Sequence, residues 1–247
     1  MPFTFSHPAL VLPLQKVSPN AFSLTGLVVG SITPDFEYFI RMGMHTSISH
    51  TLDGLFWFDL PLGLLLTFVF HNLIRNPLYE NLPLRLRMRV SDYKSFNWNT
   101  YFKAHWLNVV LSVLVGAATH LFWDAFTHNR AYFVQLFPVL NIDVIVVMGE
   151  WIPVYRILQH ISTVAGAVVI ARVIFIMPAS GIILDQPNPK YWPLVSVVVL
   201  IIVILRLFFG IEQNLLGQLA GTFTSAFLIA LVTTPFLIRK NLKTHDL

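Results

Sequence analysis

Five long apolar runs constrain the fold of this chain more than any other feature of its sequence. They cover residues 54–74, 104–127, 158–177, 192–210 and 215–238. Each run is close to the roughly 20 residues that cross a bilayer as a helix. The runs are continuous rather than alternating, which excludes a transmembrane β-barrel. Only 11% of the residues are charged, against about 25% in soluble domains. This excludes a soluble enzyme, a disordered tail and a free nucleic-acid binder.

The basic residues predict the orientation of these spans. Lysines and arginines concentrate in the 75–103 loop and in the tail after residue 238. The positive-inside rule makes that side cytoplasmic. We therefore expect a multi-pass protein of the inner (cytoplasmic) membrane with a cytoplasmic C-terminus. The 1–53 region and the 128–156 segment are then outside. Segment 132–149 is apolar enough to enter the membrane, but a sixth span would put the basic tail on the opposite side, so we expect an interfacial or re-entrant segment.

The first 53 residues contain two short apolar segments, about 7–16 and 19–32, separated by Ser18-Pro19-Asn20. Each is too short to span a bilayer, so we expect an antiparallel, re-entrant helix hairpin. The predicted fold is an all-α polytopic membrane helix bundle, with about five transmembrane helices plus this hairpin. We expect a single domain over 1–247, in which 1–53 forms the hairpin and site loops, 54–177 the spans that carry the site, and 192–238 two further apolar spans.

Ionisable side chains are expensive inside a membrane and therefore indicate a functional site. In the run THLFWDAFTH, His120, Asp124 and His128 follow one another at intervals of four residues. This spacing places them on one face of a helix. Imidazole nitrogen and carboxylate oxygen can both bind a divalent metal such as zinc. The alternative is a hydrogen-bonded polar stripe between helices, or a helix end that reaches water.

Three further segments bring similar residues to the same predicted depth. They contribute His7 before a helix start, Asp35 and Glu37 after a proline turn, and His50 before the first long run. Taken singly, His7 could contact headgroups, Asp35 could cap a helix and His50 could be solvated. Taken together with the 120–128 face, they predict a metal site with one ion and an open position, or with two ions. Glu37 and His128 could act as a general base, a supporting residue or a further ligand.

Three other ionisable residues could support such a site. Asp59 lies inside a long run two residues before Pro61, and could contact the ligands or occupy a helix kink. Arg130 could clamp a phosphate or contact headgroups. His160 could join the site or mark a solvated helix start. The chain has no cysteine, which excludes thiolate ligands and a cysteine nucleophile.

Four segments carry a resemblance to a known family: MPFTFSHPALVLPL, GSITPDFEYF, SHTLDGLFWFDLPLGLLL and THLFWDAFTH. Over roughly residues 1–175 they resemble an uncharacterised bacterial integral-membrane family, the domain-of-unknown-function family 4184. That family is more distantly similar to membrane-bound metal-dependent hydrolases. The resemblance implies metal contact by His7, Asp35, His50, His120 and Asp124. The hydrolases often have Pro-Asp-x-Asp, whereas here the second acid is the longer Glu37.

These observations predict a membrane-embedded metal-dependent hydrolase of a lipid or other amphiphilic ester or phosphoester. A metal-bound water would attack, and Asp35 or Glu37 would take its proton. We expect zinc, with manganese as the alternative, near the outer face, with membrane lipid and not nucleic acid as the partner. The alternatives are a transporter or channel with a His/Asp pathway, and a non-catalytic membrane assembly protein with a structural metal.

Overall fold

The computed structural model describes residues 3–18, 20–43, 45–179, 186–210 and 215–243, which are mainly helical. The α-helices are α1 (Pro8–Val17), α2 (Leu24–Ile32), α3 (Phe36–Arg41), α4 (Leu52–Gly54), α5 (Leu60–Val69), α6 (Arg75–Asn81), α7 (Leu84–Val90), α8 (Trp98–Thr127), α9 (Tyr132–Leu136), α10 (Val154–Ile176), α11 (Tyr191–Phe208) and α12 (Leu215–Lys243). Short 3-10 helices cover Thr4–Ser6, Thr33–Asp35, Ser91–Ser95 and Pro138–Asn141, and π-helical turns cover Leu55–Asp59 and Phe70–Ile74. The two strands are β1 (Asp143–Val147) and β2 (Glu150–Pro153). The predicted all-α architecture is confirmed.

Five helical stretches are long and apolar enough to cross a membrane, and each overlaps one of the predicted runs. They are Leu52–Asn81, Trp98–Leu136, Val154–Ile176, Tyr191–Phe208 and Gly217–Ile238. Many of their large apolar side chains are exposed, including Leu65, Leu111, Val164, Leu200 and Phe223. Lipid rather than water suits such surfaces. The chain is therefore an integral membrane protein. The end of the chain at residue 247, which we predict to be cytoplasmic, lies outside the described residues.

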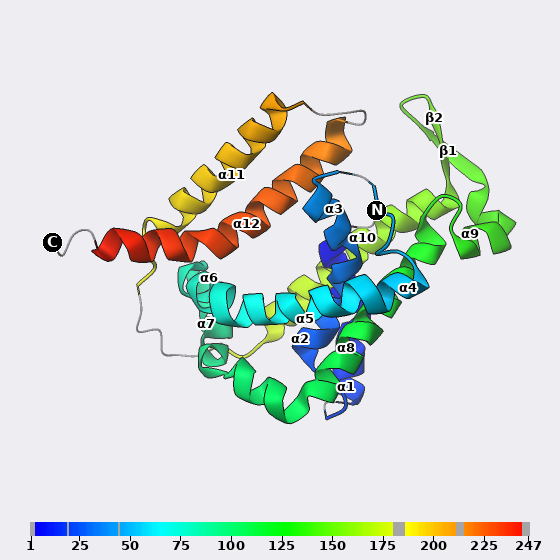
Figure 1. Ribbon diagram of the computed structural model, residues 1–247. Coiled ribbons are helices and arrows are strands. Elements are labelled where there is room, and N and C mark those ends of the chain that lie inside the picture. The colour runs from blue at the N-terminus through cyan, green and yellow to red at the C-terminus, as the bar shows by residue number, and fades with distance from the viewer. Residues whose placement is uncertain (1–2, 19, 44, 180–185, 211–214, 244–247) are drawn as a thin grey trace. The chain divides into compact units, whose positions relative to one another are not determined.

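Segment 132–149 does not form a sixth spanning helix. It contains α9, the 3-10 helix Pro138–Asn141 and β1, which pairs with β2 as an antiparallel hairpin. Figure 1 shows this hairpin as a ribbon that projects beyond the start of α10. Every residue of β1 is exposed, so neither face of this strand is covered by protein. Its interfacial position remains a prediction.

The described residues form two compact units, and each is considered separately. One contains residues 1–35, 47–64 and 105–174, and the other contains residues 36–46, 65–104 and 175–247. In the first unit, α1 and α2 pack against each other as the predicted N-terminal helix pair. The second helix starts at Leu24 rather than near residue 19, because the Ser23 side chain caps it by accepting from Gly26 N.

Small residues let α2 approach α8 closely in the same unit. A Cβ on Gly26 would come within 2.7 Å of Ser112 Cβ. On Gly30 it would overlap the Val113 carbonyl, and on Gly116 the Leu27 carbonyl. Small residues spaced four apart are a common basis of close helix packing in membranes. This contact brings the C-terminal end of α2 against the middle of α8.

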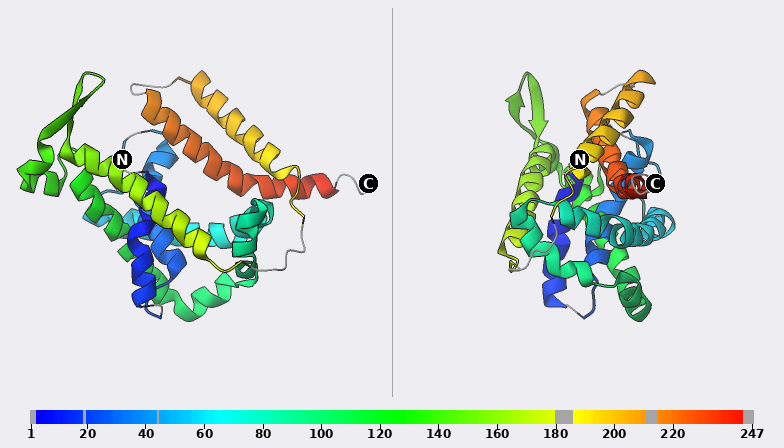
Figure 2. Two further views of the ribbon diagram at one scale, coloured as in Figure 1. Left: turned by 180° about the vertical axis from the view of Figure 1, so that it is seen from behind. Right: turned by 90° about the vertical axis from the view of Figure 1, so that its left-hand side faces the viewer.

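The second unit has its core between α11 and α12, which lie side by side in Figures 1 and 2. Tyr191, Val195 and Val199 recur every four residues along the buried face of α11. They pack with Ala226 and Ala230 on α12, which share a face by the same spacing. The opposite face of α11 is exposed and apolar, as expected for a helix in lipid.

Candidate metal centre

The first donor, His7, is held by a turn that is anchored to α10. The 3-10 helix Thr4–Ser6 ends at His7, and Pro8 starts α1, a position that suits proline because its missing N–H has no helical partner. Ser6 Oγ donates to the Thr163 carbonyl at 2.9 Å. Gly166 lies against this turn, since a Cβ there would come within 2.7 Å of the Ser6 carbonyl oxygen. The result is a His7 side chain that is almost fully buried.

The second donor, Asp35, ends the 3-10 helix Thr33–Asp35 that continues α2. Its side chain is buried, and Thr4 Oγ1 donates a hydrogen bond to its Oδ2. The other oxygen, Oδ1, lies 3.5 Å from His120 Nε2 and 3.6 Å from His50 Nε2. One carboxylate oxygen is therefore held by the chain while the other faces two imidazoles.

The face of α8 carries His120, Asp124 and His128 as the four-residue spacing predicts. His120 is completely buried, and its Nδ1 donates to the Ser31 carbonyl at 2.7 Å. A carbonyl oxygen can only accept, so the lone pair of neutral His120 is on Nε2. His120 Nε2 lies 3.3 Å from Asp124 Oδ2. His128 Nδ1 lies 3.5 Å from Asp124 Oδ1 and donates to the Asp124 carbonyl at 3.2 Å.

His50 enters the cluster from the segment that precedes α4. Its Nδ1 shares a hydrogen bond of 2.9 Å with Ser49 Oγ. Its Nε2 lies 3.6 Å from Asp124 Oδ2. The His50 side chain is 22% exposed, compared with 1% for Asp35. His50 is thus the donor on the open side of the cluster.

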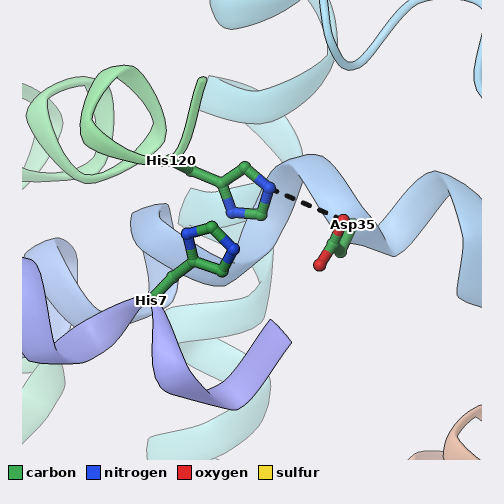
Figure 3. Close-up of side chains that lie close together, drawn as sticks. All are labelled: His7, Asp35 and His120. Carbon is green, nitrogen blue, oxygen red and sulfur yellow. Dashed lines mark ion pairs between the residues drawn. The ribbon is translucent and has the colours of Figure 1, made fainter. Parts of the chain in front are cut away.

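The structure brings all five predicted ligands together. His7 Nε2 lies 3.6 Å from Asp124 Oδ1, which completes the set of short distances among the donors. Figure 3 shows the His7 and His120 rings stacked, with Asp35 across from them; the ring centroids are 3.7 Å apart. Two overlapping triads, His7–Asp35–His120 and His50–His120–Asp124, have geometry that could hold a metal ion. They share His120.

The spacing of these donors fits ligands around an ion better than it fits hydrogen bonds. His7 Nε2, His120 Nε2, Asp35 Oδ1 and Asp124 Oδ1 are buried and form no hydrogen bond with the described residues. Buried polar atoms normally have such partners. Two ligands that are each 2.0–2.2 Å from a tetrahedral zinc ion lie about 3.3–3.6 Å apart. Five His–Asp donor distances span the same range, from 3.3 Å to 3.6 Å.

Burial and neighbouring charges control the ionisation of His7 and His50, the two histidines among the candidate ligands that lie outside the spans. Burial, reinforced by the charge of His120, lowers the pKa of His7 to about 3. His7 is therefore a neutral imidazole near neutral pH, the form that binds a metal. Burial also disfavours the charged form of His50, but the carboxylates of Asp124 and Asp35 outweigh it and raise the pKa of His50. Of these two histidines, His50 is the one for which a proton competes more strongly.

The other predicted site residues are not members of the two triads. The Glu37 carboxylate is buried and pairs with Arg41 Nη2 at 2.8 Å. Asp59 is fully buried at the end of a π-helical turn. Arg130 is exposed and has a positive φ of 60°. His160 is exposed on α10. His128, which was also predicted to support the site, does approach a candidate ligand, since its Nδ1 lies 3.5 Å from Asp124 Oδ1.

A family model for a domain of unknown function, DUF4184, matches residues 1–236. The chain belongs to this family. The predicted membership is confirmed, and the match extends beyond the expected limit near residue 175 into the last two spans. All five donors lie within the matched residues of this DUF4184 chain. A search of curated proteins and a search of solved structures each found no match.

Sequence reasoning missed the groups that orient the donors. They are Thr4, the Ser31 carbonyl and Ser49, which bond Asp35, His120 and His50 respectively. Such groups fix the tautomer and direction of metal ligands. Two local signals were present: Ser49 directly precedes His50, and the G-x-x-x-G pattern of Gly26 and Gly30 directly precedes Ser31. The pairing of Thr4 with Asp35 crosses 31 positions and has no local signal.

Proposed function

We propose that this protein is a membrane-embedded, metal-dependent hydrolase of a lipid or other amphiphilic ester or phosphoester. One observation carries the proposal: His7, Asp35, His50, His120 and Asp124 converge from four segments, and five of their His–Asp donor pairs are 3.3–3.6 Å apart. A packing role would leave several buried polar atoms without hydrogen bonds, which is costly. A divalent metal would satisfy them together.

The donor set favours zinc, with manganese as the alternative. Three imidazoles and two carboxylates are nitrogen and oxygen ligands, which both metals accept. When bound, such a metal would supply Lewis acidity and activate a water molecule near neutral pH. His50 and His128 have side-chain exposures of 22% and 28%, so the cluster is not closed on every side. An open position is typical of catalytic rather than structural metal sites.

The residues of the chain have distinct proposed roles. The five donors hold the metal, while Thr4, the Ser31 carbonyl and Ser49 orient three of them. We assign proton transfer to His128, because its Nδ1 is used by the Asp124 carbonyl and its buried Nε2 has no hydrogen bond with the described residues. Asp35 and Glu37 were the predicted proton acceptors. The contacts of Asp35 with Thr4 and two histidines suit a ligand, and Glu37 is engaged by Arg41.

The proposed location is the inner membrane, with the site near the outer face and the C-terminus in the cytoplasm. The proposal rests on the basic 75–103 loop and the basic tail. Because the chain lacks cysteine, single cysteines at exposed positions such as Asn129 can report their side of the membrane. Labelling of Asn129→Cys by a membrane-impermeant maleimide in intact spheroplasts would support this orientation, and protection would reverse it.

The function is tested by metal content and then by hydrolysis. We would purify the wild type, His120→Ala, Asp124→Ala and the control His160→Ala in detergent without chelator. We expect about one or two zinc or manganese ions per chain in the wild type and control, and loss in both site variants. Metal-loaded wild type should then hydrolyse members of a phospholipid panel, and His128→Ala should keep its metal but lose activity. A wild type that binds no metal even after reloading would overturn the proposal.

Two further measurements, of flux across proteoliposomes and of unfolding after metal removal, separate the alternatives. A transporter or channel would move ions or solutes across proteoliposomes, and its flux would not require a hydrolysed lipid. A structural metal would support folding, so its removal would unfold the protein without any hydrolysis by the loaded form. Bound metal together with lipid cleavage supports the hydrolase over both.

A further inference from the structure

An apolar cavity lies next to His7 and is not explained by metal binding. Its volume is about 330 Å³, within the range of small-molecule sites. Three helices of the first unit, α1, α8 and α10, form its walls. The apolar lining side chains are Leu10, Trp123, Leu158, Ile161, Ala165 and Val169.

The polar part of the cavity wall is small and leads to the metal centre. Ser6 and Ser162 line it, but their hydroxyls donate to main-chain carbonyls, of Thr163 and Gln159 respectively. No lysine, arginine, aspartate or glutamate is among the described residues that line it. His7 belongs both to the wall and to the metal cluster, where its Nε2 faces Asp124. The cavity is thus an apolar space with one end at a donor.

The rim of the cavity faces lipid rather than water. Ile161, Ala165 and Val169 recur every four residues on α10 and are exposed, as is Leu10 on α1. α10 is one of the five candidate spans. Exposed apolar side chains on a span are in contact with acyl chains in a bilayer. A hydrocarbon chain can therefore enter sideways from the membrane.

We propose that this cavity binds the hydrocarbon tail of the lipid substrate and so places the ester or phosphoester at the metal centre. This inference rests on the proposed function, because it names the substrate class of the same site. A water-soluble substrate would find no charged group and no free hydroxyl in the cavity. A lipid tail needs neither, and close van der Waals contact of its methylenes with the apolar wall favours its binding.

The fold couples the cavity to the donor. Gly166 packs against the Ser6 turn, and the lining residues Ala165 and Val169 flank it on α10. The same helix therefore forms the tail-binding wall and supports the turn that carries His7. A tail bound along α10 would direct its polar end toward His7 and away from the exposed rim.

Two alanines on α10 provide a matched test. Ala165 lines the cavity, whereas Ala167 is exposed on the same helix and does not line it. We would reconstitute the wild type, Ala165→Trp and Ala167→Trp in phosphatidylglycerol nanodiscs with a trace of phosphatidylglycerol that carries a diazirine in one acyl chain. After illumination, peptide mass spectrometry gives the ratio of adducts at the cavity-lining residues to adducts on α11. Metal content is measured on the same samples.

We expect a high ratio in the wild type and in Ala167→Trp. In Ala165→Trp the ratio should fall about tenfold, because the indole would occupy the space of the acyl chain; a tenfold change corresponds to about 1.4 kcal/mol. The metal content should be equal in all three proteins. Ile161→Trp, at another exposed position of the rim, should repeat the effect and guards against misfolding of one variant.

Each outcome separates this inference from the proposed function. Equal adduct ratios in the wild type and both cavity variants, with metal present, would overturn the tail site and leave the metal-dependent hydrolase standing. A high ratio of cavity adducts to α11 adducts in a wild type that binds no metal would overturn the substrate role. The inference is supported if the metal-bound wild type gives a high ratio of cavity adducts to α11 adducts. This ratio should then be lost in Ala165→Trp and kept in Ala167→Trp.

Discussion

His120 Nδ1 donates to the main-chain carbonyl of Ser31 at 2.7 Å, across 89 positions of sequence. Because this bond uses Nδ1, the Nε2 atom of neutral His120 is free of its proton and faces Asp35 and Asp124. The tautomer of a candidate ligand in α8 is therefore set by the backbone of α2.

The close contact between α2 and α8 should be necessary for metal binding. In Gly30→Ala the new Cβ would overlap the Val113 carbonyl, and the helices would separate beside Ser31. We expect a loss of about 1–3 kcal/mol in stability, the usual cost of overpacking, together with weaker zinc binding. Thermal unfolding and zinc titration of purified protein measure both. Gly221→Ala is the control, since nothing lies within 4 Å of a Cβ there; equal effects of the two changes would contradict the prediction.

The two acids after Pro34 should differ in their effect on metal content. Asp35 lies among the histidines, whereas the Glu37 carboxylate pairs with Arg41. We expect Asp35→Asn to lose most of its bound metal and Glu37→Gln to retain it. Elemental analysis of both variants, purified in parallel, decides the point. Loss of metal in Glu37→Gln with a native unfolding temperature would show that Glu37 is a ligand.

The hydroxyl of Ser49 should strengthen metal binding through His50. Removal of a group that orients a ligand typically costs 10–100-fold in affinity, and we expect a fall of about tenfold for Ser49→Ala. Competition with a fluorescent zinc chelator gives the dissociation constant. Ser95→Ala, which removes a hydroxyl bonded to the Asp92 carbonyl, serves as the control. An unchanged zinc affinity in Ser49→Ala would remove Ser49 from the site.

Metal affinity should fall as pH is lowered, and protonation of His50 should contribute to this fall. A metal binds neutral imidazole, so a proton on His50 competes with it. The pKa of His50 is raised above its ordinary value of 6.5, so affinity should already decline below neutral pH, by up to about tenfold per pH unit. His7, with a pKa lowered to about 3, should add nothing in this range. Zinc titrations between about pH 5.5 and 8 should show a shallower slope in His50→Asn than in the wild type.

The β1–β2 hairpin should contact the membrane interface. Met148 at its tip is fully exposed, and Val146 and Trp151 are exposed beside it. These exposed apolar side chains suit the headgroup boundary better than water. An environment-sensitive fluorophore on Met148→Cys should shift its emission to the blue when the protein passes into vesicles. The same label on Asn129→Cys should shift less, and equal emission at both sites would argue for a solvated hairpin.

Local sequence patterns were sufficient for the elements whose physics is local. The five spans followed from continuous apolar length, since a bilayer demands about 20 residues per helix. The shared face of His120, Asp124 and His128 followed from the geometry of the helix. The N-terminal pair of helices was also predicted, although the Ser23 cap moves the second start to Leu24.

Long-range packing decided the remainder. Whether Thr4 reaches Asp35 and whether α1, α8 and α10 enclose a cavity both depend on side chains far apart in sequence. The hairpin over residues 143–153 could not be predicted either, because a short apolar run fits a strand or a membrane helix equally well.

The sequence by itself thus determined that the chain is a helical membrane protein with a set of unusual His and Asp residues. Only the tertiary structure decided that five of those donors meet, which of their atoms face inward and what adjoins them. The physical reason is that span length and helix periodicity act over a few residues. Convergence of His7, Asp35, His50 and the α8 face depends instead on close contacts such as Gly30 against Val113, which exist only once the helices pack.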